Sequence, residues 1–362
     1  MANRQALNRI LIPIFMLILS GVVAAYTGLT AETSGGYSSN LYADSLSIGD
    51  SYLLSAISIS NTEFKTTKFR IYYDLVYYQY NTRNSINQFD HLAGLSLFRN
   101  LTGDKFKWGI DIVGTYRDYT DADSDYDNSR FFLRGNCSYY LIPGLQFKFL
   151  YQFESSSYSG FDNLNNSAHR IDGEIIKTFP SQTTARAKIQ YSNRQFAIDN
   201  SIVDWLDLEL KLTQSLDLRT GISGSGSIRF AGDGTRPLSS YYYISGITPY
   251  WDPWDGYQFN LSCKRIFPWG IVATADFDYW LRTFNYSESQ QSELPWLSGI
   301  GGRDDKGWLL KADINRQFNL YGKFGQAIRI ALMPGYLSNS SDDPYYEYEY
   351  FFINLSVKLD VF

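Results

Sequence analysis

The residues of this 362-residue chain that could do chemistry are mostly charged, and the densest acidic group is a run of aspartates. The run consists of Asp121, Asp123, Asp125 and Asp127. This alternate spacing is that of the first ligands of a calcium-binding loop, but Tyr126 stands where such a loop has glycine and Phe132 where it has its last glutamate. We therefore predict a solvated loop here, with a weak divalent-cation site as the alternative.

Histidine and cysteine residues are too few for an enzyme site of a familiar kind. Catalysis by proton or group transfer needs a base beside a nucleophile or an activated water. Neither His91 nor His169 stands in such a motif, and no spacing typical of a zinc site is present. We predict no enzyme, no catalytic residue, no resident metal and no cofactor, and we interpret the histidines as structural or interfacial groups. Cys137 and Cys263 fall on apolar faces, so we interpret them as inert side chains.

Charged residues of both signs recur at alternate positions of long segments, opposite the apolar residues. The residues predicted to share this polar face are Arg70, Asp74, Asp111, Arg117, Arg130, Arg134, Lys148, Glu154, Arg186, Lys188, Arg194, Glu209, Lys211, Arg219, Asp276, Asp278, Arg282, Lys311, Asp313 and Arg329. Such a set needs water or partners of opposite charge, because unpaired buried charge is strongly unfavourable.

The elements that must position these residues have a hydrophobic period of 2, which predicts β-strands rather than helices of period 3.6. The clearest segments are 145–154, 183–194, 205–213 and 351–361, and the same pattern covers 69–80, 107–117, 130–141, 216–230, 257–267, 271–284, 308–318 and 328–336. Strands of a soluble sandwich usually have about 5–6 residues. The segments here are long enough to cross a bilayer at a tilt, which takes about 9–11 residues.

The fold class predicted from these segments is a transmembrane, antiparallel, up-and-down β-barrel of about 16 strands, with 14 as the alternative. Short turns are expected at 100–104, 143–144, 180–181, 268–270 and 319–322, and long loops at 118–128, 156–168, 285–306 and 337–346. The strand count is ambiguous near the middle of the chain. Counted from the N-terminus, 231–239 is extracellular; counted from the C-terminus, it is periplasmic and 250–256 is extracellular.

Residues 1–25 are typical of a signal peptide, since Arg4 and Arg9 precede an apolar stretch that ends at Val23-Ala24-Ala25. We predict three parts: a signal peptide (1–25), a polar periplasmic lead-in (26–50) and the barrel (51–362). The predicted location is the bacterial outer membrane, with both termini periplasmic.

Composition supports a barrel wall and excludes several other classes. Aromatic residues make up 17% of the chain, with 30 Tyr, and charged residues only 19%. A helical membrane protein would need repeated apolar stretches of about 20 residues, and only the N-terminus has one. The net charge of −5 and the lack of clustered basic residues argue against a nucleic-acid partner. Tyr241–Tyr243, Trp251, Trp254 and Trp269 are predicted to lie in an interfacial aromatic girdle, with sugar stacking as the alternative.

Two segments resemble known outer-membrane proteins. The last strand, 351–361, alternates and ends at Phe362, which is similar to the signal read by the barrel-assembly machinery, although Phe362 is out of phase with the apolar face. The opening Gly35-Gly36-Tyr37-Ser38-Ser39-Asn40-Leu41 resembles that of beta-barrel porin 2-like proteins, with Ser38 in place of the usual Asp. Similar openings, and an aromatic loop like 250–257, occur in barrels of exopolysaccharide export systems. The resemblance implies a partner for such export, encoded separately.

Two functions therefore remain as hypotheses. The first is a porin-like channel for small polar solutes or ions, whose mixed-charge lumen sets ion selectivity; Arg186, Lys188 and Arg194 would then favour anions. The second is a partner-dependent barrel for a polymer such as an exopolysaccharide or a sleeve for another protein, in which ion pairs fill the interior. Expected partners are outer-membrane lipid, lipopolysaccharide, the barrel-assembly machinery and a periplasmic or secreted protein.

Overall fold

The computed structural model describes residues 27–40, 49–64, 67–82, 86–101, 105–120, 127–160, 162, 165–197, 202–232, 254–284, 303–320 and 326–361. These residues form sixteen strands in one closed barrel. The predicted signal peptide, the aspartates at 121–125, Tyr241–Tyr243, Trp251 and Phe362 lie outside the described residues. Among the described residues, no helix is long and apolar enough to cross a membrane.

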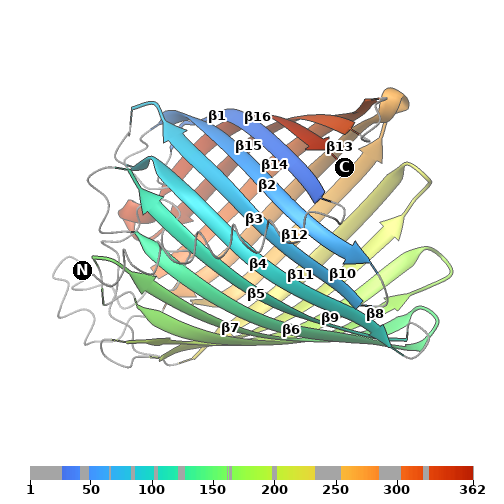
Figure 1. Cartoon of the computed structure of the whole chain (residues 1–362). Coiled ribbons are helices and arrows are strands. Elements are labelled where there is room, and N and C mark those ends of the chain that lie inside the picture. Colours follow the sequence, from blue (N-terminus) through green and yellow to red (C-terminus); the bar gives the residue numbers. More distant parts are fainter. Residues whose placement is uncertain are drawn as a thin grey trace, which may run out of the picture.

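Each strand pairs with its neighbours in sequence, and all pairs are antiparallel (Figure 1). The strands are β1 (Thr27–Ser38), β2 (Asp50–Phe64), β3 (Thr67–Tyr80), β4 (Gln88–Leu101), β5 (Phe106–Tyr119), β6 (Asn128–Ile142), β7 (Leu145–Tyr158), β8 (Asn166–Thr178), β9 (Thr183–Phe196), β10 (Ile202–Ser215), β11 (Thr220–Ala231), β12 (Trp254–Ile266), β13 (Ile271–Phe284), β14 (Arg303–Leu320), β15 (Gln326–Ser341) and β16 (Tyr348–Val361). Of the two strand numbers that the sequence allows, 16 is confirmed.

The barrel closes where β1 pairs with β16, in register from Leu29 opposite Val361 to Ser38 opposite Phe352. This pairing corrects the prediction that residues 26–50 are a lead-in, because 27–38 are a strand of the wall. The segment was missed because small residues such as Ala31 and Gly35 occupy much of its outward face, so its alternation is weak.

The two ends of the barrel differ in the length of their connections. We call them the turn end, where β10 and β11 are joined at 216–219, and the loop end, where β11 and β12 are joined through 232–253. β11 ends at Ala231 and β12 begins at Trp254, both at the loop end, and these two strands pair directly. This pairing resolves the ambiguity in the strand count, because it places β11 and β12 next to each other in the sixteen-strand barrel.

The predicted long loops are shorter than expected at several places. β14 begins at Arg303 and β15 ends at Ser341, so both strands extend into ranges that the sequence assigns to loops. Polar residues near these strand ends disguised the extension. The predicted strand 216–230, in contrast, begins late, because 216–219 is a turn and β11 starts at Thr220.

The turn at 216–219 is built around an aspartate. The backbone N–H of Arg219 donates to Oδ1 of Asp217 at 2.6 Å. This hydrogen bond lowers the pKa of Asp217 below its ordinary value, because it stabilises the ionised carboxylate. The short turn at Pro143-Gly144 uses a different device, since Gly144 has φ of 77°, which a residue with a side chain rarely adopts.

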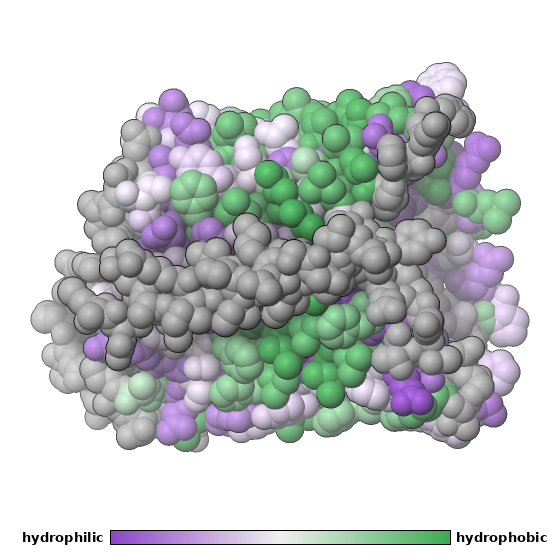
Figure 2. Space-filling model, viewed as in Figure 1, coloured by the Kyte–Doolittle hydropathy of each residue, from purple (hydrophilic) through white to green (hydrophobic). Residues whose placement is uncertain are grey.

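Alternation divides every strand into an outward and an inward face. On β10, Leu208, Leu210 and Leu212 are exposed, and Leu210 reaches 68%. Their register partners on neighbouring strands, such as Ile189, are exposed as well. Figure 2 shows hydrophobic residues gathered across the middle of the visible face, with hydrophilic residues toward both ends. This is the arrangement that lipid requires around a barrel.

Five inward aromatic rings lie over glycines directly opposite them on the next strand. The pairs are Tyr52 over Gly36, Tyr72 over Gly94, Phe98 over Gly109, Trp280 over Gly307 and Phe352 over Gly335. A Cβ at each glycine would come within 2.2–2.6 Å of the ring. Glycine therefore lets these rings lie flat against the wall instead of projecting into the interior.

The histidines and cysteines lie at outward strand positions. A hydrogen bond of 2.8 Å joins the Tyr73 hydroxyl to Nδ1 of His91, and one of the same length joins Tyr151 to His169. Cys137 is opposite Phe149, and both Cys137 and Cys263 are free. These groups therefore stand apart from the polar face.

Candidate functional site: the inner wall

The residues predicted to share the polar face take inward positions of the barrel strands, with one exception. The register shows this directly: Glu209 pairs with Lys188, Lys188 with Glu174 and Glu174 with Lys148, while exposed leucines and isoleucines alternate with them. The exception is Arg219, which lies in the turn between β10 and β11 rather than in a strand.

A charged sector of the inner wall extends over β7–β10. Arg186 stands at its centre, with Nε 3.0 Å from Glu174 and Nη2 3.1 Å from Glu209. Lys148 lies 3.6 Å from Glu174, so these four residues form one connected chain of ion pairs. A network of several charges is a stronger source of stability than isolated exposed ion pairs, which contribute little.

A second set of ion pairs lies nearer the loop end. Asp172 pairs with Arg170 at 2.6 Å and with Lys188 at 3.6 Å. Arg194, which is almost buried, pairs with Glu154 at 3.6 Å. The basic stripe predicted at Arg186, Lys188 and Arg194 is thus present on β9, and each of its members has a carboxylate beside it.

These ion pairs follow the wall. Those of Arg186 and Lys188 join neighbouring strands, and that of Arg194 joins β9 to β7 across β8. Their partners therefore lie on the same side of the barrel. Within the described residues, none of the ion pairs of this network crosses the interior to the opposite side of the barrel.

Asp90 on β4 is a partner that sequence reasoning missed. It forms a two-pronged ion pair with Arg117, with Nε to Oδ1 at 2.7 Å and Nη2 to Oδ2 at 2.8 Å. Both residues are inward and directly opposite in the register. On the inward face of β4, apolar Leu92 lies between polar Asp90 and Ser96. The sequence therefore shows no continuous polar face for this strand.

Arginines and tryptophans alternate in a stack along the inner wall near the loop end. We call it the Arg–Trp stack; its members are Trp205, Arg229, Trp254, Arg282 and Trp280. The Arg229 guanidinium lies 5.2 Å from the Trp205 ring centroid and 4.2 Å from that of Trp254, and Arg282 lies 5.1 Å from both Trp254 and Trp280. These distances are those of cation–π interactions.

The Arg–Trp stack corrects the prediction for Trp254. This residue does not lie in an outward girdle: it is only 4% exposed and inward, because β12 begins with it in the inward phase. Trp269, in contrast, is 80% exposed in the turn between β12 and β13. Next to the stack, Arg303 is buried between the rings of Phe284 and Tyr346, at 3.8 and 3.6 Å.

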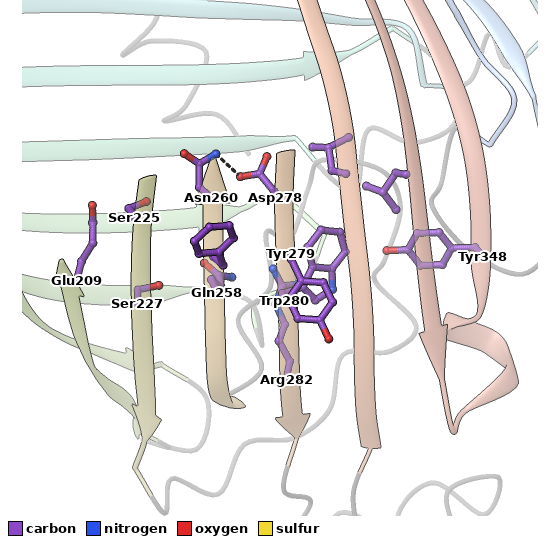
Figure 3. A pocket seen from close by; sticks show the side chains of 13 residues that line it. Glu209, Ser225, Ser227, Gln258, Asn260, Asp278, Tyr279, Trp280, Arg282 and Tyr348 are labelled. Carbon is purple, nitrogen blue, oxygen red and sulfur yellow. Dashed lines mark hydrogen bonds between the residues drawn. The ribbon is translucent and has the colours of Figure 1, made fainter. Parts of the chain in front are cut away.

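Next to the stack lies a cavity of about 410 Å³, drawn in Figure 3. Its polar lining includes Glu209 from β10, Ser225 and Ser227 from β11, Gln258 and Asn260 from β12, and Asp278 from β13. The rest of the lining comprises Phe259, Tyr279, Trp280, Arg282, Leu309, Leu337 and Tyr348. The volume is in the range of small-molecule sites, about 300–1,000 Å³.

A metal site is not formed by the part of the chain that the structure describes, where no group of three or more possible ligands gathers. Of the alternating aspartates, Asp127 is described, and it has a structural role. Its Oδ1 accepts the backbone N–H of Tyr119 at 2.8 Å and so ties the ends of β5 and β6 together.

The comparisons with known proteins place the fold. No protein-family model and no curated protein matches the sequence. Among solved structures, OccAB4 of Acinetobacter baumannii is similar at 10% identity over 93% of this chain and 98% of that chain, with a TM-score of 0.52. OpdQ of Pseudomonas aeruginosa is similar at 10% identity over 92% and 97%, with a TM-score of 0.51. A bacterial polysaccharide outer membrane secretin is similar at 8% identity over 91% and 97%, with a TM-score of 0.50. The chain therefore has the fold of an outer-membrane β-barrel.

Proposed function

We propose that this protein is an outer-membrane channel that passes small polar solutes or ions, and that its mixed-charge inner wall acts as the filter. The observation that carries the proposal is a closed barrel with an apolar outer face and a charged inner wall whose network of ion pairs follows the wall. Barrels of about 16 strands are wide enough to leave an aqueous channel between their walls.

The structure neighbours support the barrel on which this proposal rests, because OccAB4 and OpdQ share the fold and span nearly the same length of chain. In this proposal the turn end and both chain termini are periplasmic, as short turns are in outer-membrane barrels. The loop end, with the Arg–Trp stack beneath it, is then the extracellular mouth.

The second candidate is a partner-dependent barrel for polymer export, as the resemblance of residues 35–41 to beta-barrel porin 2-like and export barrels implies. The specific observation in its favour is the similarity to a polysaccharide secretin at a TM-score of 0.50, close to that of the other neighbours. A barrel of this kind would conduct only when its partner is present.

Conductance of the purified full chain in planar lipid bilayers tests the proposal. We expect stable single-channel steps in potassium chloride without any added protein, because the inner wall is charged and hydrated. A barrel that inserts and remains closed, and that opens only with a co-purifying partner, would support the export function instead. Heat-modifiable migration on a gel verifies in either case that the barrel is folded.

A further inference from the structure

The cavity in Figure 3 lies between two rows of inward residues that the strand register sets side by side. The first row is Glu209, Ser227, Gln258, Trp280, Gly307, Asn339 and Tyr348, and the second is Lys211, Ser225, Asn260, Asp278, Leu309, Leu337 and Tyr350. The wall is recessed here because Gly307 has no side chain and the Trp280 ring lies flat over it. Nε1 of Trp280 donates to Oδ1 of Asn339 at 3.0 Å, which fixes the ring in that position.

Asp278 is the distinctive charge of this cavity. On β10, in contrast, Asp207 is paired with Arg229 at 2.7 Å and Glu209 with Arg186 at 3.1 Å. Asp278 has no such cation among the described residues; it accepts one hydrogen bond, from Nδ2 of Asn260 at 2.8 Å. Its register partner on β14 is Leu309, which cannot compensate the charge. A carboxylate in this position favours a positively charged ligand group.

The neutral polar groups beside Asp278 are mostly available as acceptors. Because Asn260 donates its amide N–H to Asp278, its carbonyl oxygen remains for another donor. In the described part of the chain, the side chains of Ser225, Ser227 and Gln258 have no hydrogen-bond partner, although they line the cavity. A ligand group with several N–H donors, such as an ammonium, fits this lining.

The opposite side of the cavity is apolar and aromatic. Leu309 and Leu337 are directly opposite each other on β14 and β15, and Tyr348 follows on β16. A hydrocarbon body can pack here while its charged end reaches Asp278. Arg282 lines the rim toward the loop end, where its guanidinium is stacked between Trp254 and Trp280.

We propose that this cavity is a binding station for a small organic ammonium solute, with Asp278 as the ion partner of the ammonium and Leu309, Leu337 and Tyr348 around its hydrocarbon body. As a station on a solute path, it deepens the proposed channel function and rests on it. The lining of the cavity indicates a substrate class for the channel: amine cations with a short aliphatic or aromatic body.

Isothermal titration calorimetry on the folded full chain in detergent tests the site independently of conductance. The probes are n-butylammonium, n-butanol and butyrate, which share a chain length and differ in charge. We expect n-butylammonium to bind at least tenfold more tightly than the other two, since a charge-assisted hydrogen bond is lost with either. Tighter binding of butyrate, equal binding of n-butanol, or no binding of n-butylammonium would overturn the proposal.

Two variants locate the ammonium. Asp278→Asn keeps the shape and removes the charge, so we expect about tenfold weaker binding of n-butylammonium. Asp276→Asn is the matched control: Asp276 is the next inward residue of β13 but is not part of the cavity lining, and its replacement should leave binding unchanged. Equal effects of the two variants would contradict the assignment.

Conductance of the same preparations separates this inference from the channel function. Single-channel steps without n-butylammonium binding would support the channel function and contradict the binding site. If the barrel never conducts but binds n-butylammonium, and Asp278→Asn abolishes that binding, the channel function would be contradicted. The site would then be a ligand-binding pocket.

Discussion

At the scale of single residues, glycine and aromatic side chains act as pairs across neighbouring strands. Each of the five inward rings described above uses the space that a missing Cβ leaves on the strand beside it. The rings bury apolar surface against the wall, and the interior is kept free of their bulk. The same glycines would be a weakness in an ordinary strand, because they have no side chain to pack.

The pair of Gly335 and Phe352 offers a direct test. In Gly335→Ala, the new Cβ would come within 2.2 Å of the Phe352 ring, so the ring must move. We expect the free energy of unfolding to fall by about 1–3 kcal/mol, as for other overpacked sites. Urea titration of the barrel refolded into lipid vesicles measures the change.

The matched control for that variant is Gly135→Ala on β6, where nothing lies within 4 Å of an added Cβ. We expect a change within about 0.5 kcal/mol, as for substitutions away from tight contacts. Equal loss in the two variants would mean that strand glycines matter for their backbone alone and that the rings contribute nothing.

At the scale of elements, the Arg–Trp stack joins the loop-end halves of β10 to β13. Trp254 is its central member, since it lies between Arg229 at 4.2 Å and Arg282 at 5.1 Å. Arg229 also holds Asp207 through Nε and Nη2, at 2.7 and 2.9 Å. The stack thereby fixes four strands next to the long connection at 232–253.

Trp254→Ala should remove two cation–π contacts and leave a cavity, with a loss of about 3–5 kcal/mol of unfolding free energy. Trp254→Phe keeps a ring and should restore much of that loss. Trp269→Ala, at an exposed turn, should change stability by about 0.5 kcal/mol or less. The urea midpoint checks all three variants, and a loss in Trp269→Ala as large as that in Trp254→Ala would contradict a special role for the stack.

Much of the wall could be predicted from the sequence, because the alternation of apolar and polar residues depends only on strand geometry. It identified β7, β9, β10 and β16 closely. It missed β1, whose outward residues are small, and it misjudged Trp254, since aromatic residues serve both an outer girdle and an inner stack. Side-chain partners depend on the register between strands, which the sequence pattern leaves open. The isolation of Asp278 and the pairing of Arg117 with Asp90 therefore required the structure.

At the scale of the whole molecule, the charged sector of β7–β10 has its carboxylates neutralised in place. Arg186 contributes most to this, since it lies beside both Glu174 and Glu209. A solute in the lumen would meet a wall whose local charges nearly cancel, so a small change in the balance is expected to alter ion selectivity.

Arg186→Gln should make the channel more selective for cations, because it leaves Glu209 without its ion partner. We expect the cation-to-anion permeability ratio to rise roughly two- to fivefold, since a unit charge at about 4 Å in water is worth about 1 kcal/mol. Reversal potentials in a potassium chloride gradient measure the ratio, and Arg186→Lys, which keeps the charge, is the control. A ratio that falls or stays constant in Arg186→Gln would show that this pair does not face the permeating ions.

The seam between β1 and β16 has a consequence for how the chain reaches its final topology. The other strand pairs of the barrel are neighbours in sequence, and side-chain links such as that of Arg134 with Gln152 span only 18 residues. Across the seam, the Thr30 hydroxyl donates to Asp360 over a separation of 330 residues. Short-range contacts form at little entropic cost, whereas closing a long loop is slow. The long-range backbone contacts of the barrel are therefore concentrated in the β1–β16 ladder. The hairpins can form in any order, and the rate at which the barrel closes depends on the pairing of these two strands.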